Sequence, residues 1–192
     1  MKIHWCCGDI YLDGYINIDA NGEYSDLVSE KKLNMNVTNL GKYFKYPFIE
    51  DKEIRQANRR PIIVDEMKNI LEPWDFENKS LDEIVMISCL EHFWYRDALM
   101  IIEEVKRTLK KGGKWIVDFP DLKKQMDMYY GVNDEFLIEL IYCNHKNQFS
   151  IHHWGYTEKS FAKLFNPLEY KVEYKTIVEH AYPMIGAIVT KL

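Results

Sequence analysis

The sequence predicts an α/β fold: an open, mostly parallel sheet with helices on both faces and an antiparallel strand pair at the carboxyl end. Three observations support this prediction. Short apolar stretches alternate with a helical pattern, which is the order of elements in α/β domains. The clearest strand, at 81–89, holds the unbroken apolar run Ile84 to Ile87, which is typical of a parallel strand covered on both faces. Two further strand patterns close the chain.

The amino-terminal part of the sequence predicts three short strands. The first, at 2–7, is apolar and ends at a glycine, and the second, at 15–18, follows the turn signal Asp13-Gly14. The third, at 61–64, ends at an acidic residue. The stretch at about 36–60 lies between the second and third strands, and it is predicted to be an insertion or lid.

The best helical pattern follows the strand at 81–89. Asp97 is a candidate cap or first-turn acid, and apolar residues then recur at helical spacing as far as Leu109. Lys110 and Lys111 suit the negative end of the helix dipole, and Gly112-Gly113 predicts a left-handed end to the helix. The remaining elements are a strand at 114–119, a partly helical substrate-side segment at about 122–157, a helix capped by Thr157, and strands at 170–178 and 185–190.

Length, charge and cysteine content narrow the class of protein. A chain of 192 residues with 47% hydrophobic and 29% charged residues is expected to form one globular domain, 1–192. Its net charge of −5 disfavours general binding to nucleic acid or to anionic membranes. No apolar run has the length of a membrane span or signal peptide, so a cytoplasmic location is expected. Four cysteines without a Cys-x-x-Cys pair predict free thiols in a reducing compartment.

Acidic residues end nearly every predicted strand. They are Asp9, Asp19, Asp65 with Glu66, Glu91 and Asp121. In parallel sheets the carboxyl ends of the strands form the ligand site, and an acid after the second strand can accept hydrogen bonds from a ribose diol. Gly8, which follows the first strand, lets a ligand approach the backbone closely.

Two blocks of sequence resemble the class I S-adenosylmethionine-dependent methyltransferases. The first runs from Ile3 to Asp19 and contains Cys-Cys-Gly-Asp. The second contains Leu90-Glu-His, then Arg-Thr-Leu-Lys-Lys-Gly-Gly ending at Gly113, then Asp-Phe-Pro-Asp ending at Asp121. The resemblance extends from residue 2 to about 121, and order, spacing and chemistry agree in the second block. It implies a Rossmann-like sheet and transfer of a methyl group from S-adenosyl-L-methionine.

The resemblance also implies a set of cofactor-binding residues. Cys7, Gly8 and Asp9 would lie under the methionine part, and Asp19 would bind the ribose hydroxyls. Asp65, with the backbone of Glu66 and Met67, would lie near the adenine amine. The last group, near the methyl, comprises Cys89, Leu90 and Glu91. A carboxylate-rich rim suits this cofactor, because its hydroxyls and amine donate hydrogen bonds and its sulfonium is cationic.

The first block departs from the family pattern in two ways. Gly8 is the single match to the usual glycine motif, and ten residues separate it from Asp19. That length is too short for a crossover helix, so a short loop is predicted between the first two strands. These departures keep open a methyltransferase-like domain that binds a partner without catalysis. A nicotinamide oxidoreductase is disfavoured, because no Gly-x-Gly-x-x-Gly follows the first strand.

Methyl transfer needs positioning and sometimes a base that takes a proton from the acceptor. His92 is the best-placed candidate, and a structural role at a helix start is the alternative. Asp121 is either a catalytic group or a helix cap. His152, His153 and Tyr156 are further candidates for the base, in a segment that is either a substrate lid or a loop packed by its own aromatic side chains.

No metal site is predicted, although one group of residues has suitable chemistry. Cys143, His145, His152 and His153 have the ligand types that zinc prefers, but their spacing matches no known pattern. The sequence therefore predicts a methyltransferase acting on a small-molecule or glycan-type acceptor, with no membrane partner and with nucleic acid disfavoured.

Overall fold

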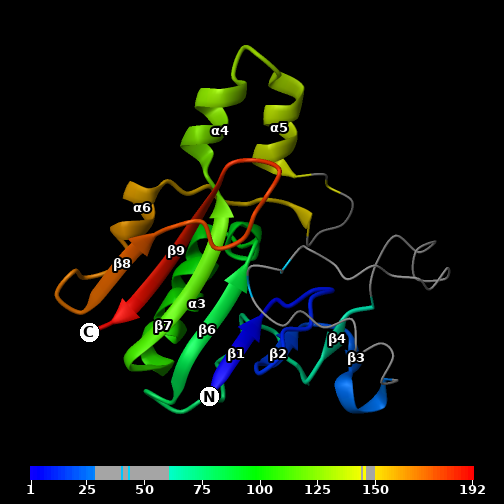
Figure 1. Cartoon of the computed structure of the whole chain (residues 1–192), viewed down its shortest axis with the longest axis vertical. Helices are drawn as coiled ribbons and strands as arrows, with labels where there is room; N and C mark the ends of the chain where they lie inside the picture. Colours follow the sequence, from blue (N-terminus) through cyan, green and yellow to red (C-terminus); the bar gives the residue numbers. More distant parts are fainter. Residues whose placement is uncertain (29–39, 41–42, 44–60, 144, 146–149) are drawn as a thin grey trace.

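The computed structural model describes residues 1–28, 40, 43, 61–143, 145 and 150–192 (Figure 1). Its centre is a seven-stranded sheet in the order β5-β2-β1-β6-β7-β9-β8. The strands from β5 to β7 are parallel, and β9 runs antiparallel to both β7 and β8, which confirms the predicted fold class. The bounds are β1 Lys2–Trp5, β2 Ile16–Asp19, β5 Glu66–Met67, β6 Leu81–Ile87, β7 Leu109–Pro120, β8 Tyr170–Tyr174 and β9 Met184–Lys191.

The connection between β1 and β2 is the short loop that the sequence predicts. Residues 6–15 contain no helix, yet Ile3 pairs with Ile16 in parallel register. Ile10 and Leu12 are buried against the sheet within this loop. The loop therefore covers the sheet face that a crossover helix would otherwise cover.

The third strand differs from the prediction. Within 61–64, β4 (Ile63–Val64) pairs with β3 (Glu23–Tyr24) in a separate two-stranded sheet, and β5 takes the edge position beside β2. The chain changes sheets at Asp65, where its backbone N–H donates to the Asn17 carbonyl at 2.8 Å. A 3₁₀ turn, η1 (Ser25–Leu27), follows β3.

The helix after β6 begins as predicted but ends earlier. α3 (Tyr95–Thr108) carries Asp97 in its first turn and buries an apolar face. It ends at Thr108, because the next residue, Leu109, is extended and begins β7. There Leu109 is fully buried and pairs with Leu81 of β6. Residues 110–113 then form an irregularity in β7, so Gly112 and Gly113 do not end the helix. Lys110 pairs with Asp82 at 2.7 Å instead of capping α3.

Arg107, from the motif before the double glycine, fixes the loop that leads into β6. Its guanidinium donates to the carbonyls of Phe76 at 2.7 Å and Trp74 at 2.9 Å. It also pairs with Glu104 on the same helix at 2.6 Å. Trp74 in turn contacts Trp5 of β1, with ring centroids 5.0 Å apart. Arg107 thus links α3 to the edge of the main core.

The two faces of the sheet carry separate apolar cores. α3 and α6 (Glu158–Ala162) pack on one face, where Trp115, Phe119 and Phe161 are buried together. Thr157 caps α6 through a capping box with Ser160, as predicted, although the helix is short. The opposite core combines residues of β6 and β7 with Ile10, Leu12, Tyr43 and Val178. The predicted lid at 36–60 lies outside the described residues, apart from 40 and 43.

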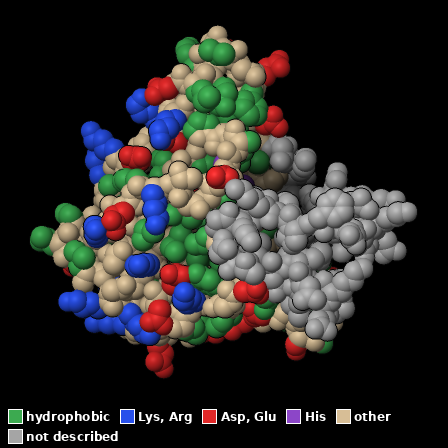
Figure 2. All heavy atoms as spheres, viewed as in Figure 1, with side chains coloured by type: hydrophobic (Ala, Val, Ile, Leu, Met, Phe, Trp, Pro, Cys, Tyr) green, Lys and Arg blue, Asp and Glu red, His purple; other side chains and the backbone are tan. Residues whose placement is uncertain are grey.

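The substrate-side segment is a helical hairpin beyond the strand ends. α4 (Leu122–Tyr129) and α5 (Asp134–Tyr142) stand above the carboxyl ends of β6 and β7 in Figure 1. Figure 2 shows hydrophobic side chains gathered over this hairpin. Met128, Tyr130, Val132 and Ile138 are exposed there. Among the described helices, none has the length and hydrophobicity that crossing a membrane requires.

Replacing Phe161 tests the core that holds α6 to the sheet. Its ring is fully buried and packs against Trp115, Phe119 and Phe165. We expect Phe161→Ala to lower the free energy of unfolding by about 3–5 kcal/mol, because it removes a large side chain from a packed core. Urea denaturation measures the change. Leu168→Ala, at a residue that is 85% exposed, is the control and should stay within about 0.5 kcal/mol of the unmodified protein.

Candidate functional site

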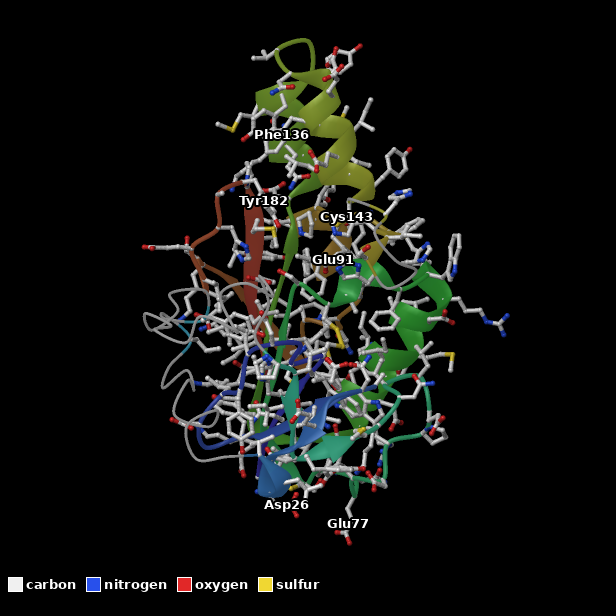
Figure 3. The ribbon with its side chains drawn as sticks, turned by 90° about the vertical axis from the view of Figure 1, so that its right-hand side faces the viewer. Asp26, Glu77, Glu91, Phe136, Cys143 and Tyr182 are labelled. Atoms are coloured by element: carbon white, nitrogen blue, oxygen red, sulfur yellow. A yellow bond between two sulfur atoms is a disulfide. The ribbon has the colours of Figure 1, made fainter. Side chains whose placement is uncertain are left out.

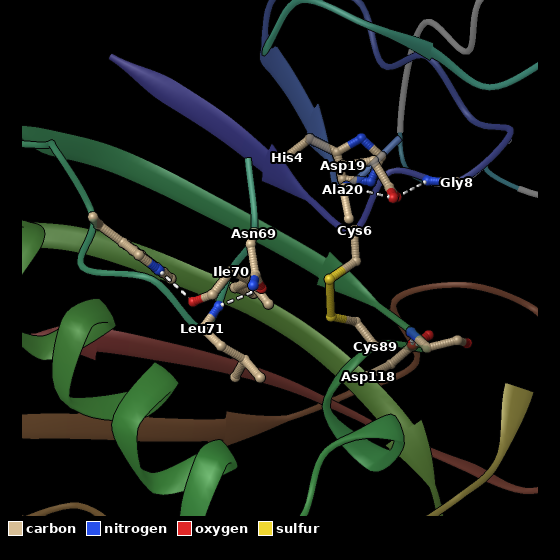
Figure 4. The surroundings of a disulfide bond; sticks show 12 residues. His4, Cys6, Gly8, Asp19, Ala20, Asn69, Ile70, Leu71, Cys89 and Asp118 are labelled. Atoms are coloured by element: carbon tan, nitrogen blue, oxygen red, sulfur yellow. Dashed lines mark hydrogen bonds between the residues drawn. A yellow bond between two sulfur atoms is a disulfide. The ribbon is translucent and has the colours of Figure 1, made fainter. Parts of the chain in front are cut away.

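The turn after β1 and the end of β2 meet at Gly8 and Asp19 (Figure 4). The Gly8 N–H donates to Asp19 Oδ2 at 2.9 Å, and the Ala20 N–H donates to Oδ1 at 2.7 Å. Gly8 has a φ of +53°, and within the described part of the chain no atom beyond its two neighbouring residues lies within 4 Å of where its Cβ would be. A carboxylate has about four lone-pair positions, so these two bonds leave Asp19 able to accept from further hydroxyls.

The cysteines of this turn differ from the prediction. Cys6 and Cys89 form a disulfide across the carboxyl ends of β1 and β6, with their Cα atoms 6.1 Å apart (Figure 4). The two parallel strands are neighbours, so the residues that follow them face each other. Cys7 stays a free thiol, as predicted, and so does Cys143. Burial, together with the charges of Asp19 and nearby acids, raises the pKa of Cys7.

Asp65 has four hydrogen-bond donors within the protein. Tyr11 and Ser25 donate their hydroxyls to Oδ1 at 2.7 and 2.6 Å. Asn17 donates to Oδ2 through its backbone N–H at 2.8 Å and its side-chain amide at 3.2 Å. Burial raises the pKa of Asp65, but these bonds outweigh that effect and hold it below its usual value. Both oxygens of Asp65 therefore have partners within the protein, and its position near the adenine amine remains a prediction.

The neighbours of Asp65 lie on β5, the edge strand. Glu66 pairs with Lys68 at 2.5 Å, and Met67 is 37% exposed beside Asp19 in the parallel register. Their backbone thus runs alongside the end of β2, close to the predicted ribose site. The role proposed for them beside the adenine remains a prediction.

A buried polar network lies beneath the turn. His4 Nδ1 bonds Asn17 Oδ1 at 2.9 Å, and His4 Nε2 bonds the Tyr43 hydroxyl at 2.8 Å. The same Asn17 oxygen accepts the Leu12 N–H at 2.8 Å. Burial lowers the pKa of His4 to about 4 despite its bond to Asn17, so the ring is neutral at pH 7.

The turn after β6 places a buried acid beside the strand ends. η3 (Leu90–His92) carries Glu91, which is 2% exposed and lies below the α4–α5 hairpin (Figure 3). Glu91 Oε2 has no hydrogen-bond partner among the described residues. Burial, and to a smaller extent the charge of Asp118, raises the pKa of Glu91 well above its usual value.

Two histidines stand next to this acid. The rings of His92 and His152 are 4.8 Å apart between centroids. His92 Nδ1 contacts the Ile151 carbonyl and His152 Nδ1 contacts the Leu140 carbonyl, both at 3.1 Å. Burial lowers the pKa of both rings, that of His92 to about 4. Since a carbonyl can only accept, each Nδ1 carries the proton and each Nε2 offers a lone pair.

The other predicted catalytic residues have different settings. Asp121 caps α4 by accepting the Lys124 N–H at 3.0 Å, which favours the capping alternative. His153 donates its backbone N–H to the Glu91 carbonyl at 2.8 Å, and its ring stacks on Trp94. Tyr156 is buried, and its hydroxyl has no partner among the described residues. Burial and the nearby Glu91 raise its pKa.

The substrate-side segment lines a small, partly open cavity beside these residues. Its volume is about 110 Å³, and its lining comes from α4, α5 and the segment 152–155. His152 and His153 lie on its wall. The cavity therefore connects the histidines with the hairpin that was predicted to contact the acceptor.

A buried contact between a histidine and an aspartate was missed by the sequence analysis. His180 Nε2 lies 2.7 Å from Asp118 Oδ2, and both residues line a second cavity of about 240 Å³. Asp118 also accepts the Ser88 N–H at 2.8 Å, which joins it to the end of β6. A charged residue inside the apolar strand 114–119 was a usable signal for Asp118. Nothing in the spacing pointed to His180, which comes from the loop between β8 and β9.

The zinc alternative of Cys143, His145, His152 and His153 does not match the structure. Among the described residues, one nitrogen of His92, one of His152 and one Glu91 carboxylate oxygen lie within 4.8 Å of one another. Of the four residues considered before, only His152 belongs to this group. The spacing within 143–153 could not identify the other members, because they come from the turn after β6.

Comparisons with known proteins agree with this architecture. Residues 46–117 match the family model described as a methyltransferase domain. A Methanosarcina mazei S-adenosylmethionine-dependent methyltransferase shares 17% identity over 98% of this chain and 89% of its own, with a TM-score of 0.51. A chain from the complex of a Haloferax volcanii methyltransferase with its activator shares 10% identity over 99% and 81%, with a TM-score of 0.55.

A third structure covers a shorter share of its own chain. An O-methyltransferase family protein from Burkholderia thailandensis shares 12% identity over 99% of this chain and 50% of its own, with a TM-score of 0.54. At these identities the solved structures show a shared fold. Curated protein sequences give no match.

The neutral His4 ring makes stability depend on pH. Unfolded histidine binds a proton near pH 6.5, whereas folded His4 binds one only near pH 4. Between these values the unfolded state holds the extra proton, so acidification destabilises the fold by about 1.4 kcal/mol per pH unit. We expect His4→Gln to reduce the slope of unfolding free energy against pH by about 1.4 kcal/mol per pH unit, which corresponds to one proton. Denaturation at a series of pH values from about 7 to 4.5 measures this slope. Equal slopes in both proteins would contradict the conclusion that the pKa of His4 is lowered in the folded state.

Proposed function

We propose that this chain is a class I S-adenosylmethionine-dependent methyltransferase and that it methylates a small-molecule or glycan-type acceptor bound below the α4–α5 hairpin. The observation that carries the proposal is the continuous rim along the strand ends. It runs from Asp19 through Gly8 and the Cys6–Cys89 disulfide to Glu91 and the histidines. In open α/β sheets this edge is where ligands bind.

The residues at one end of the rim fit the cofactor. Gly8 leaves open space over the turn, and Asp19 keeps acceptor positions for two hydroxyls. We propose that Asp19 binds the ribose and that the 7–9 turn supports the methionine part. Cys89, Leu90 and Glu91 follow β6, so in this proposal they lie between the cofactor and the acceptor.

When bound, the cofactor supplies an electrophilic methyl on a sulfonium, which becomes a neutral thioether once an acceptor lone pair bonds the methyl carbon. The chain's own task is to position the acceptor and to help remove its proton. His92 fits this role because its ring is neutral at pH 7 and its Nδ1 bond leaves a lone pair on Nε2. His92 is the catalytic residue of the proposal and acts on the acceptor through that lone pair.

The acceptor class follows from size and charge. The cavity lined by His152 and His153 has about 110 Å³, which suits a small group or the end of a sugar rather than a folded polymer. The net charge of −5 disfavours a polyanion. Tyr142 and Trp154 line the same cavity, and aromatic rings of this kind offer an apolar wall for an acceptor.

Thermal unfolding with added ligands tests the cofactor assignment. A ligand at about 100 times its dissociation constant stabilises the fold by about 2.7 kcal/mol. For a chain of this length we expect the unfolding midpoint to rise by roughly 5–10 °C with S-adenosylmethionine and S-adenosylhomocysteine. NAD, as the control, should cause no rise. The absence of a shift with millimolar sulfur cofactors would favour a binding domain without catalysis.

Replacing Asp19 tests the ribose site directly. We expect Asp19→Ala to weaken S-adenosylhomocysteine binding more than tenfold, because hydrogen bonds to a charged group contribute about 1.5–3 kcal/mol. Isothermal titration calorimetry measures the dissociation constant. Asp26→Ala removes an exposed acid of η1 and should leave the affinity unchanged. An unchanged affinity in Asp19→Ala would remove this residue from the site.

A further inference from the structure

We propose that Glu91, His92 and His152 bind one divalent transition-metal ion, which holds an oxygen atom of the acceptor beside the transferred methyl. This inference rests on the proposed function for the identity of the acceptor, but the metal site itself stands on the geometry of the three side chains. One donor atom from each lies within 4.8 Å of the others. Two imidazoles and one carboxylate are a donor set that suits zinc, manganese, iron or cobalt.

The fold brings the three side chains together through backbone hydrogen bonds. Glu91 and His92 are adjacent in η3, at the carboxyl end of β6. His152 comes from the segment after α5, and its N–H donates to the Tyr142 carbonyl at 3.2 Å. The next residue, His153, donates its N–H to the Glu91 carbonyl at 2.8 Å, which ties that segment directly to η3.

Both histidines are oriented as metal ligands usually are. A ligating histidine typically donates its second ring N–H to a carbonyl or carboxylate, which fixes the tautomer and the direction of the lone pair. His92 does this with the Ile151 carbonyl, and His152 does it with the Leu140 carbonyl. Since both Nδ1 atoms are engaged in this way, Nε2 is the ring nitrogen that each histidine has left to bind a shared ion.

The carboxyl group of Glu91 supplies an independent indication of a metal site. It is almost fully buried, and its Oε2 has no hydrogen-bond partner among the described residues. Buried polar atoms are nearly always paired, so an orphaned carboxylate oxygen indicates a missing ligand. A bound cation would satisfy this oxygen and would also offset the negative charge of the neighbouring Asp118.

The site also leaves room for an acceptor. Donor atoms about 2.1 Å from a tetrahedral ion are roughly 3.4 Å apart, so the three side chains need to close only by small rotations. Three protein ligands leave an open coordination position, as in catalytic metal sites. His152 lines the 110 Å³ cavity below the hairpin, from which an acceptor hydroxyl can reach that position. The ion would lower the pKa of the bound hydroxyl, whose proton would leave to water, and the Nε2 lone pair of His92 would hold the ion instead of taking that proton directly.

Direct metal binding tests the inference without relying on activity. Tag-free protein is stripped with EDTA, dialysed and titrated with Co²⁺, and visible absorption reports the coordination. Mass spectrometry then counts zinc in a Zn²⁺-loaded sample. We expect one ion per chain, with Zn²⁺ displacing Co²⁺. Glu91→Gln and His152→Gln should each weaken binding at least tenfold, because each removes one of three ligands.

His145→Gln is the matched control, since this exposed histidine lies outside the cluster, and its metal affinity should not change. The thermal shift with S-adenosylhomocysteine, repeated on each variant, shows whether the fold and the cofactor site survive. The inference is overturned if the unmodified protein binds no stoichiometric metal, or if a folded His152→Gln binds metal as tightly as the unmodified protein. A normal cofactor shift without metal binding would leave the proposed function standing and overturn the metal site. Metal binding without a cofactor shift would support the metal site and count against the proposed function.

Discussion

The buried side chain of Asn17 is the interaction on which the amino-terminal half of the structure depends. Its Oδ1 accepts from His4 and from the Leu12 backbone, and its Nδ2 donates to the carbonyls of Leu12 and Tyr15 and to Asp65. A single amide thereby joins β1, the loop, β2 and the chain before β5. This hub allows two parallel strands to be linked by ten residues without a helix, because the polar groups of the loop find partners inside the protein.

The rim of the site follows from that short connection. Since the loop turns directly after β1, Gly8 comes to lie over Asp19, and Cys6 faces Cys89 on the next strand. The other half of the rim has a different physical character. There Glu91, Tyr156 and the neutral histidines are buried with few charged partners, and this is the basis of the cation site and the acceptor site that we propose.

Sequence reasoning was most successful where local signals and tertiary packing agree. The unbroken apolar run of β6, the amphipathic face of α3 and the Thr157 cap all appeared as predicted. It was wrong where burial of one residue outweighed a local signal. Leu109 joins the sheet opposite Leu81, so the helix ends before the two glycines. The pairing of Cys6 with Cys89 was also missed, because composition alone does not show which strand ends become neighbours.

The sequence by itself determined the order of the elements, the fold class and the acids that end the strands, because periodicity and turn residues are local properties of the chain. Only the tertiary structure decided what those acids do. Asp65 accepts hydrogen bonds within the protein, whereas Asp19 has lone-pair positions left over. Glu91 lies close to His152, which is sixty-one positions further along the chain. Such differences depend on which neighbours the sheet brings together, and that information is carried by contacts between distant segments.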